Sequence, residues 1–140
     1  MLYDPTLVQP MRDELTSIGV RELNTPEEVD EAIGEGAGTT MLVVNSVCGC
    51  AARNARPAVA LSTRHPVQPD QKVTVFAGQD TAATARAREY FDGYRPSSPS
   101  IALIRNGDVV YMLERHQIEG RVADDISADL TAAFDRFCAN

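Results

Sequence analysis

The sequence predicts an α/β fold with a central mixed sheet, helices on both faces of that sheet and an extra N-terminal helix. Helical and strand-like segments alternate along the 140 residues, and such alternation builds parallel strands joined by right-handed crossovers. Two later strands, 100–105 and 108–113, are joined by Asn106-Gly107, a strong hairpin signal because both turn positions favour positive φ. The hairpin makes the sheet mixed. The length suits one domain, predicted over residues 1–140.

The N-terminal third predicts two helices. Apolar residues at helical spacing favour a helix over 5–18 that ends at Gly19, followed by a short strand over 20–23. The next helix starts after Thr25, which can cap it, and Glu28 can complete a capping box. Glycines are expected to end this helix, namely Gly34, Gly36 and Gly38.

The middle of the chain predicts two buried strands and two helices. The branched apolar run 40–45 is typical of a strand covered on both faces. An Ala-rich helix follows over 51–61, and Pro57 inside it should remove a backbone bond and cause a kink. A loop over 62–71 then leads to a strand over 72–77.

The remaining helices are expected over 81–92 and 123–137. Asp80 can cap the first of them. Its candidate core contacts are Ala82, Ala85 and Tyr90. The last helix carries an apolar face formed by Ile126, Leu130, Ala133, Phe134 and Phe137.

Charge and composition exclude several classes of partner. Thirteen basic and twenty acidic residues give a net charge of −7, which repels polyanions and argues against nucleic acid binding. The N-terminus lacks the basic start and apolar run of a signal peptide, and no stretch is apolar enough to span a membrane. These features predict a cytoplasmic protein without a membrane partner.

The cysteine pair Cys48-Gly49-Cys50 is the main candidate for chemistry. It lies where a strand gives way to a helix, and the free amides and positive end of a helix N-terminus stabilise a thiolate, the attacking species. Arg53 and Arg56 are expected to add positive potential, although they equally suit a solvated helix face. No Asp or Glu occurs between residues 41 and 69 to raise a thiol pKa locally.

Gly49 also suits a redox role for the pair. A disulfide across one intervening residue closes a tight ring, and glycine adopts the required backbone angles most cheaply. Such a strained bridge is easily reduced. The sequence therefore favours a cycling disulfide and a catalytic role for Cys48 and Cys50.

Two other interpretations of the cysteines remain open. Buried free cysteines often act only as small apolar residues. A zinc site would need Cys138 together with His65 or His116, but zinc pairs usually have two to four intervening residues, so no metal site is predicted. A non-catalytic redox-sensing or metal-binding module is therefore the alternative to an enzyme.

The cysteine segment from Val43 to Ala52 resembles the signature of the bacilliredoxin family. Further segments resemble that family in the same order along the chain. They are Pro10-Met11-Arg12, Val73 to Asp80, Ser97 to Ser100, Arg115 to Gly120 and Leu130 to Asp135.

The resemblance implies a thioredoxin-like fold and removal of bacillithiol, or a similar low-molecular-weight thiol, from mixed disulfides on oxidised cytosolic proteins. Cys48 would be the nucleophile, and Cys50 could resolve the adduct by closing an internal bridge. Bacillithiol would be a co-substrate, with no bound cofactor. The implied partners are S-thiolated client proteins and a recycling enzyme, such as a flavin-dependent disulfide reductase. General disulfide isomerase or reductase activity is an alternative.

The resemblance also assigns a binding role beside the cysteines. In thioredoxin-like folds a cis-proline faces the cysteine motif and binds an extended thiol-bearing partner, so we expect a cis bond before Pro99. Gly49, Ser98 and Pro99 are the predicted substrate-binding residues. The roles of Cys138 and His116 stay open: Cys138 suits a solvent-exposed bystander near a frayed chain end, and His116 suits a structural loop position better than proton transfer.

Overall fold

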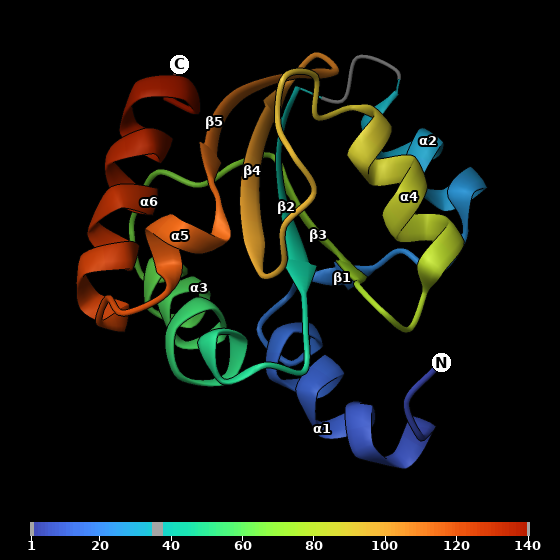
Figure 1. The fold of residues 1–140 in the computed structure, drawn as a ribbon. Helices are drawn as coiled ribbons and strands as arrows, with labels where there is room; N and C mark the ends of the chain where they lie inside the picture. Colours follow the sequence, from blue (N-terminus) through green and yellow to red (C-terminus); the bar gives the residue numbers. More distant parts are fainter. Residues whose placement is uncertain (1, 35–37, 140) are drawn as a thin grey trace.

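The computed structural model describes residues 2–34 and 38–139, and Figure 1 shows their arrangement. Five strands form one sheet in the order β1-β3-β2-β4-β5. β2 (Thr39–Asn45) is parallel to β3 (Gln71–Phe76), which in turn is parallel to the short β1 (Arg21–Glu22). β4 (Ser100–Arg105) runs antiparallel to β2, and β5 (Asp108–Leu113) antiparallel to β4. The predicted mixed sheet is confirmed.

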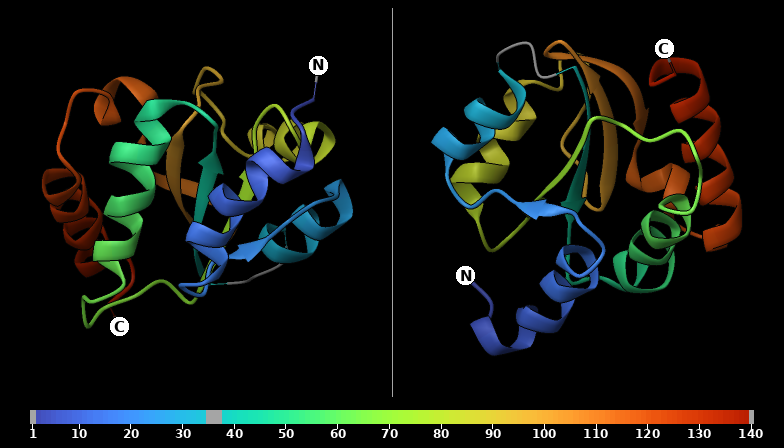
Figure 2. Two further views of the ribbon diagram at one scale, coloured as in Figure 1. Left: turned by 90° about the horizontal axis from the view of Figure 1, so that it is seen from below. Right: turned by 180° about the vertical axis from the view of Figure 1, so that it is seen from behind.

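Helices cover both faces of the sheet. α3 (Arg56–Ser62) and α6 (Ala123–Phe137) pack together on one face, and α2 (Pro26–Ile33) and α4 (Thr81–Glu89) pack together on the other (Figure 2). Successive side chains of a strand point to opposite faces. Thus Met41 and Val43 join one apolar core, and Leu42 and Val44 join the other. This double coverage explains why every residue of β2 is buried.

Local signals place the first two helices. α1 (Pro5–Thr16) ends two residues before the predicted end, and Gly19 has φ +90°. At α2, the Thr25 side chain accepts from the Glu28 amide while Glu28 caps the helix start in return, so the predicted capping box is confirmed. Gly34 is the C-cap of α2, whereas the expectation for Gly36 lies outside the described residues.

The helix after the cysteines differs from a simple proline kink. The segment η1 (Ala51–Ala55) is π-helical, and the Arg56 amide donates to the Ala51 carbonyl five residues earlier before α3 begins. Pro57 then occupies the first turn of α3. Proline has no N–H to donate. The π-helical turn places Pro57 at the start of α3, where an amide would have no partner within that helix.

Three expectations about α4 are corrected. The helix ends at Glu89 and not at residue 92. Its buried residues are Ala83, Thr84 and Ala87, whereas Ala82 and Ala85 are exposed; of the predicted contacts, Tyr90 does pack against the core. Asp80 is the N-cap residue, but its side chain makes no capping bond.

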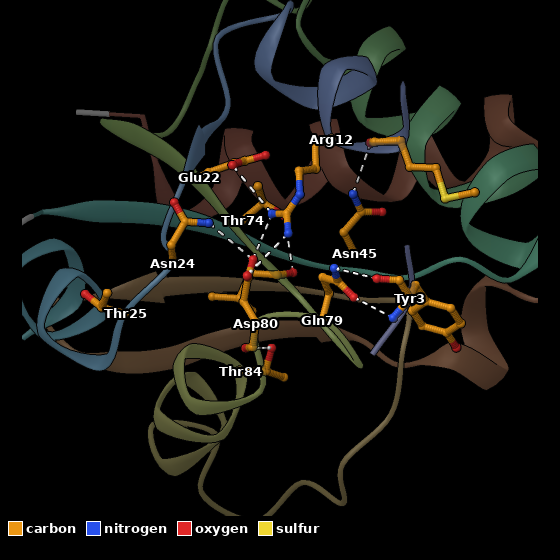
Figure 3. A network of polar contacts seen from close by, with 12 residues as sticks. Tyr3, Arg12, Glu22, Asn24, Thr25, Asn45, Thr74, Gln79, Asp80 and Thr84 are labelled. Carbon is orange, nitrogen blue, oxygen red and sulfur yellow. Dashed lines mark hydrogen bonds and ion pairs between the residues drawn. The ribbon is translucent and has the colours of Figure 1, made fainter. Parts of the chain in front are cut away.

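Asp80 instead holds the N-terminal helix. Its carboxylate accepts from Arg12 at 2.8 Å and 3.3 Å and from Asn24 at 3.2 Å. Figure 3 shows the Arg12 guanidinium between Asp80 and Glu22, and the same group lies 5.1 Å from the centroid of the Phe76 ring. This network fastens α1 to the edge of the sheet where β1 and β3 end.

The C-terminal part agrees with the sequence apart from one short helix. Asn106 and Gly107 both have positive φ, as the hairpin requires, and α6 has the predicted bounds. One-turn α5 (Arg115–Ile118), which follows β5, was not predicted. Among the helices in the described ranges, none is long and apolar enough to cross a membrane.

Candidate active site

Cys48 lies where the sequence predicts, just beyond β2 and directly before a helical segment that starts at residue 49. Cys48 is half-buried, and its thiol is free. The Cys48 carbonyl accepts from the amides of Ala51 and Ala52, which closes the first turn. The Cys48 amide donates to the Ser46 hydroxyl at 3.2 Å. The loop is therefore ordered by local bonds on both sides of the sulfur.

The surroundings of Cys48 favour its thiolate. Burial by itself raises the pKa of the thiol, but this effect is outweighed by hydrogen bonds from the Ser46 hydroxyl and from the backbone amides of Ala51 and Cys50. The positive charge of Arg115 adds to them, so the Cys48 pKa lies below its ordinary value. Donors aimed at the sulfur stabilise its charged form. Cys48 is thus suited to be a nucleophile.

Cys50 lies in the opposite electrostatic situation. Burial, the adjacent Glu119 carboxylate and the charge of Cys48 all raise the pKa of Cys50 above its ordinary value, and Arg115 opposes them only in part. Glu119 Oε2 lies 3.3 Å from the Cys50 sulfur. The two cysteines are therefore unequal: their surroundings favour the thiolate at Cys48 and the thiol at Cys50.

Arg115 and Glu119 are site residues that sequence reasoning missed. Arg115 begins α5 and Glu119 directly follows it, so their side chains meet at i,i+4 with an Nε–Oε2 distance of 3.1 Å. The sequence did contain the i,i+4 spacing of Arg115 and Glu119. Arg115 lies 65 residues and Glu119 69 residues from Cys50 along the chain, so no local pattern indicated their contact with it. No carboxylate lies near the cysteines in sequence, but the fold brings the carboxylate of Glu119 next to Cys50.

The Ser98–Pro99 peptide bond is cis, as expected. Pro99 is buried and Ser98 half-buried directly before β4, whose Ser100 pairs with Val44 of β2. Arg115 Nη1 donates to the Ser98 carbonyl at 3.2 Å. Arg115 therefore connects the proline loop with the cysteine pair. The substrate-binding role of Gly49, Ser98 and Pro99 stays a prediction.

Arg53 and Arg56 occupy different environments. Arg56 is only 2% exposed, and its Nη1 donates to the Asn45 side-chain oxygen at 3.0 Å and to the Ser46 carbonyl at 2.9 Å. Arg53 is exposed, with its guanidinium beside Gly49. Their tuning of the Cys48 pKa stays a prediction, whereas Arg115 is the arginine whose charge lowers that pKa.

The residues of the alternative zinc site are not brought together. Cys138 is half-buried against the core and not solvent-exposed as expected. Burial raises the pKa of its thiol, and the Thr39 side chain beside it opposes this only in part. Thr39 begins β2, whereas Cys48 follows its end. A seven-residue strand separates these ends by roughly 20 Å. His65 binds Asp135 at 2.7 Å, and His116 is exposed on α5. Among the described residues no group of three His, Cys, Asp or Glu could hold a metal ion.

Comparison with known proteins shows the family of this chain. A family model described as "Disulphide isomerase" matches residues 3–138. A bacilliredoxin of Koribacter versatilis is 52% identical over 98% of this chain and 94% of its own length. One from Salinibacter ruber is 56% identical over 100% and 84%, and one from Halalkalibacterium halodurans is 53% identical over 95% and 91%.

Solved structures identify the fold. Thioredoxin from Malassezia sympodialis superposes with a TM-score of 0.58 at 16% identity, covering 86% of this chain and 91% of that one. A mutant thioredoxin from Halobacterium salinarum gives 0.57 at 16% identity, covering 88% and 94%. At such identity these structures show the fold, while the relatives above show the family. The chain has a thioredoxin-like fold and belongs to the bacilliredoxin family of thiol–disulfide oxidoreductases.

Proposed function

We propose that this oxidoreductase removes bacillithiol, or a similar low-molecular-weight thiol, from mixed disulfides on oxidised cytosolic proteins, with Cys48 as the nucleophile. The observation that carries the proposal is the contrast between the two cysteines: the surroundings lower the pKa of Cys48 and raise that of Cys50. Relatives that are 52–56% identical to this chain are named bacilliredoxins, which supports bacillithiol as the thiol that is removed.

The transfer balances without any added oxidant. The Cys48 thiolate attacks the sulfur of the small thiol in the mixed disulfide, the client sulfur leaves as a thiolate, and that thiolate takes a proton from water. Cys48 then carries the small thiol as a new mixed disulfide. Gly49, Ser98 and Pro99 would bind the client beside the sulfur. A second molecule of the small thiol would attack the adduct, release a symmetric small disulfide and restore the Cys48 thiolate. A flavin-dependent disulfide reductase, supplied with two electrons by a reduced nicotinamide, would return that disulfide to two thiols.

A trapping experiment tests the assignment. A cytosolic protein carrying one bacillithiol is incubated with the wild type and with Cys48→Ala, Cys50→Ala and Cys138→Ala variants, and release of the client thiol is followed. We expect Cys48→Ala to be inactive, Cys50→Ala to retain the first transfer, and Cys138→Ala, the matched control at the far end of β2, to match the wild type. Intact-mass analysis of Cys50→Ala should show one bacillithiol adduct.

Full activity in Cys48→Ala would refute the nucleophile assignment. Transfer of glutathione or of cysteine at the same rate would refute a preference for bacillithiol and leave a general thiol exchanger. Slow alkylation of Cys48 by iodoacetamide until the protein unfolds would instead support a non-catalytic module.

A second candidate is disulfide isomerisation, which the description of the matching family model favours. It needs Cys48 to attack a protein disulfide and a client thiolate to release it again. Reactivation of scrambled ribonuclease separates the two: an isomerase restores its activity without any low-molecular-weight thiol disulfide present, and a dedicated bacillithiol remover does not.

A further inference from the structure

An acidic side chain lies against the second cysteine and has no part in the transfer described above. Glu119 Oε2 is 3.3 Å from the Cys50 sulfur, and Arg115 Nε binds the same oxygen at 3.1 Å. Arg115 Nη2 also lies 3.8 Å from the Cys50 sulfur. With Cys48, these are the charged and titratable groups that act on Cys50 within the described part of the chain.

The contact defines the protonation state of both partners. Hydrogen bonds from Cys50 and from Arg115 lower the pKa of Glu119, so it is a carboxylate at neutral pH. An ionised carboxylate can only accept hydrogen bonds, which means that Cys50 must keep its proton to make the contact. A Cys50 thiolate would place two negative charges together, and like charges disfavour ionisation.

We infer that Glu119 keeps Cys50 in the thiol form while Cys48 carries a transferred thiol, so that an external thiol rather than Cys50 releases the adduct. This role rests on the proposed function. In the favoured route an external thiolate attacks the adduct sulfur, a disulfide between two small thiols forms, and Cys48 leaves as a thiolate. In the disfavoured route Cys50 gives its proton to water and attacks the Cys48 sulfur. The cysteines are then oxidised to a disulfide, and the small thiol leaves reduced.

A general-base role for Glu119 would have the opposite effect on Cys50. The carboxylate is a far weaker base than a thiolate, and its bond to Arg115 weakens it further. In exchange reactions the rate follows the fraction of thiolate. A neighbour that reduces this fraction therefore slows closure of the internal bridge.

A two-phase reaction with one equivalent of dithiobis(nitrobenzoate) tests the inference in a Cys138→Ser background. The first nitrothiobenzoate released reports attack by Cys48, and the second reports bridge closure by Cys50. Glu119→Gln keeps the size and an oxygen acceptor but removes the charge. The matched control is Glu31→Gln, which removes one charge from an exposed position on α2. Cys50→Ala should abolish the second phase.

We expect Glu119→Gln to retain a full first phase and to accelerate the second phase at pH 7. Each tenfold gain in thiolate is offset by lower nucleophilicity with a Brønsted coefficient of about 0.4–0.5, so the second phase should gain roughly three- to fourfold for every tenfold gain in thiolate. At a pH where Cys50 is fully ionised in both proteins the advantage of Glu119→Gln should disappear and reverse, because the wild-type thiolate has the higher pKa and is then the stronger nucleophile. Glu31→Gln should match wild type throughout.

The two phases separate the possible failures. An unchanged or slower second phase in Glu119→Gln, with a normal first phase, overturns the inference, and a slower one identifies Glu119 as a base. A missing first phase in the folded wild type would instead overturn the assignment of Cys48 in the proposed function.

Discussion

Replacing Arg56 by Met should destabilise the fold and loosen the loop that carries Cys48. The guanidinium is buried, and its Nη1 satisfies two acceptors, the Asn45 side-chain oxygen and the Ser46 carbonyl. Met has a similar length but no donor. The Asn45 oxygen keeps a second donor, the Ser46 amide at 2.9 Å, so the Ser46 carbonyl is the acceptor that the substitution deprives most. A buried acceptor left without a partner costs about 1–3 kcal/mol, whereas removing a buried charge returns part of that cost.

The net expectation for Arg56→Met is a loss of about 1–2 kcal/mol in the free energy of unfolding. The other partner of Arg56 limits the loss, because Glu14 lies 3.2 Å from Nε but is 48% exposed and can be solvated. Urea unfolding of the reduced protein measures the change through the midpoint at constant m-value. Since Ser46 also bonds the Cys48 thiol, the Cys48 pKa from iodoacetamide alkylation should rise in the variant.

Arg53→Met is the matched control, because it makes the same substitution three residues earlier at an exposed site. It should change the unfolding free energy by less than about 0.5 kcal/mol. Equal stability of the two variants, or a loss below about 0.5 kcal/mol for Arg56→Met, would refute the structural role of the buried guanidinium.

Three further substitutions probe the site and the N-terminal helix. Arg115→Gln removes the charge that favours the Cys48 thiolate, so the pH profile of Cys48 alkylation should shift to higher pH and the rate at pH 7 should fall; a shift to lower pH would contradict this. Gly49 has ordinary backbone angles in the free-thiol state, and an added Cβ would meet only the far end of the Arg53 side chain. Gly49→Ala should therefore change the unfolding free energy of the reduced protein by less than about 1 kcal/mol, and a larger loss in reductant would show that the glycine already matters before the bridge closes. Asp80→Ala removes the acceptor of Arg12 and should cost about 2 kcal/mol by urea unfolding, with Cys48 alkylation unchanged; altered alkylation would show that this network reaches the site.

The sequence predicted the order of elements well because each signal was local. The turn at Asn106-Gly107, the capping box at Thr25 and the unbroken apolar run of β2 depend on neighbours within a few residues. The short α5 was missed because four residues give too little periodicity to be recognised. The buried face of α4 was misplaced because alanines dominate it and provide little hydrophobic contrast.

The sequence alone determined the Cys-Gly-Cys pair at the N-terminus of a helix. It also determined the family that this motif and its companion segments resemble. What only the tertiary structure decided is how the two sulfurs differ. Residues near the cysteines in sequence supply the amides and the Ser46 hydroxyl. Glu119, whose carboxylate raises the pKa of Cys50, and Arg115, whose charge favours both thiolates, arrive from the segment after β5. Electrostatic forces act through space over a few ångströms, so a carboxylate 69 residues away along the chain can govern a thiol that no local pattern connects to it.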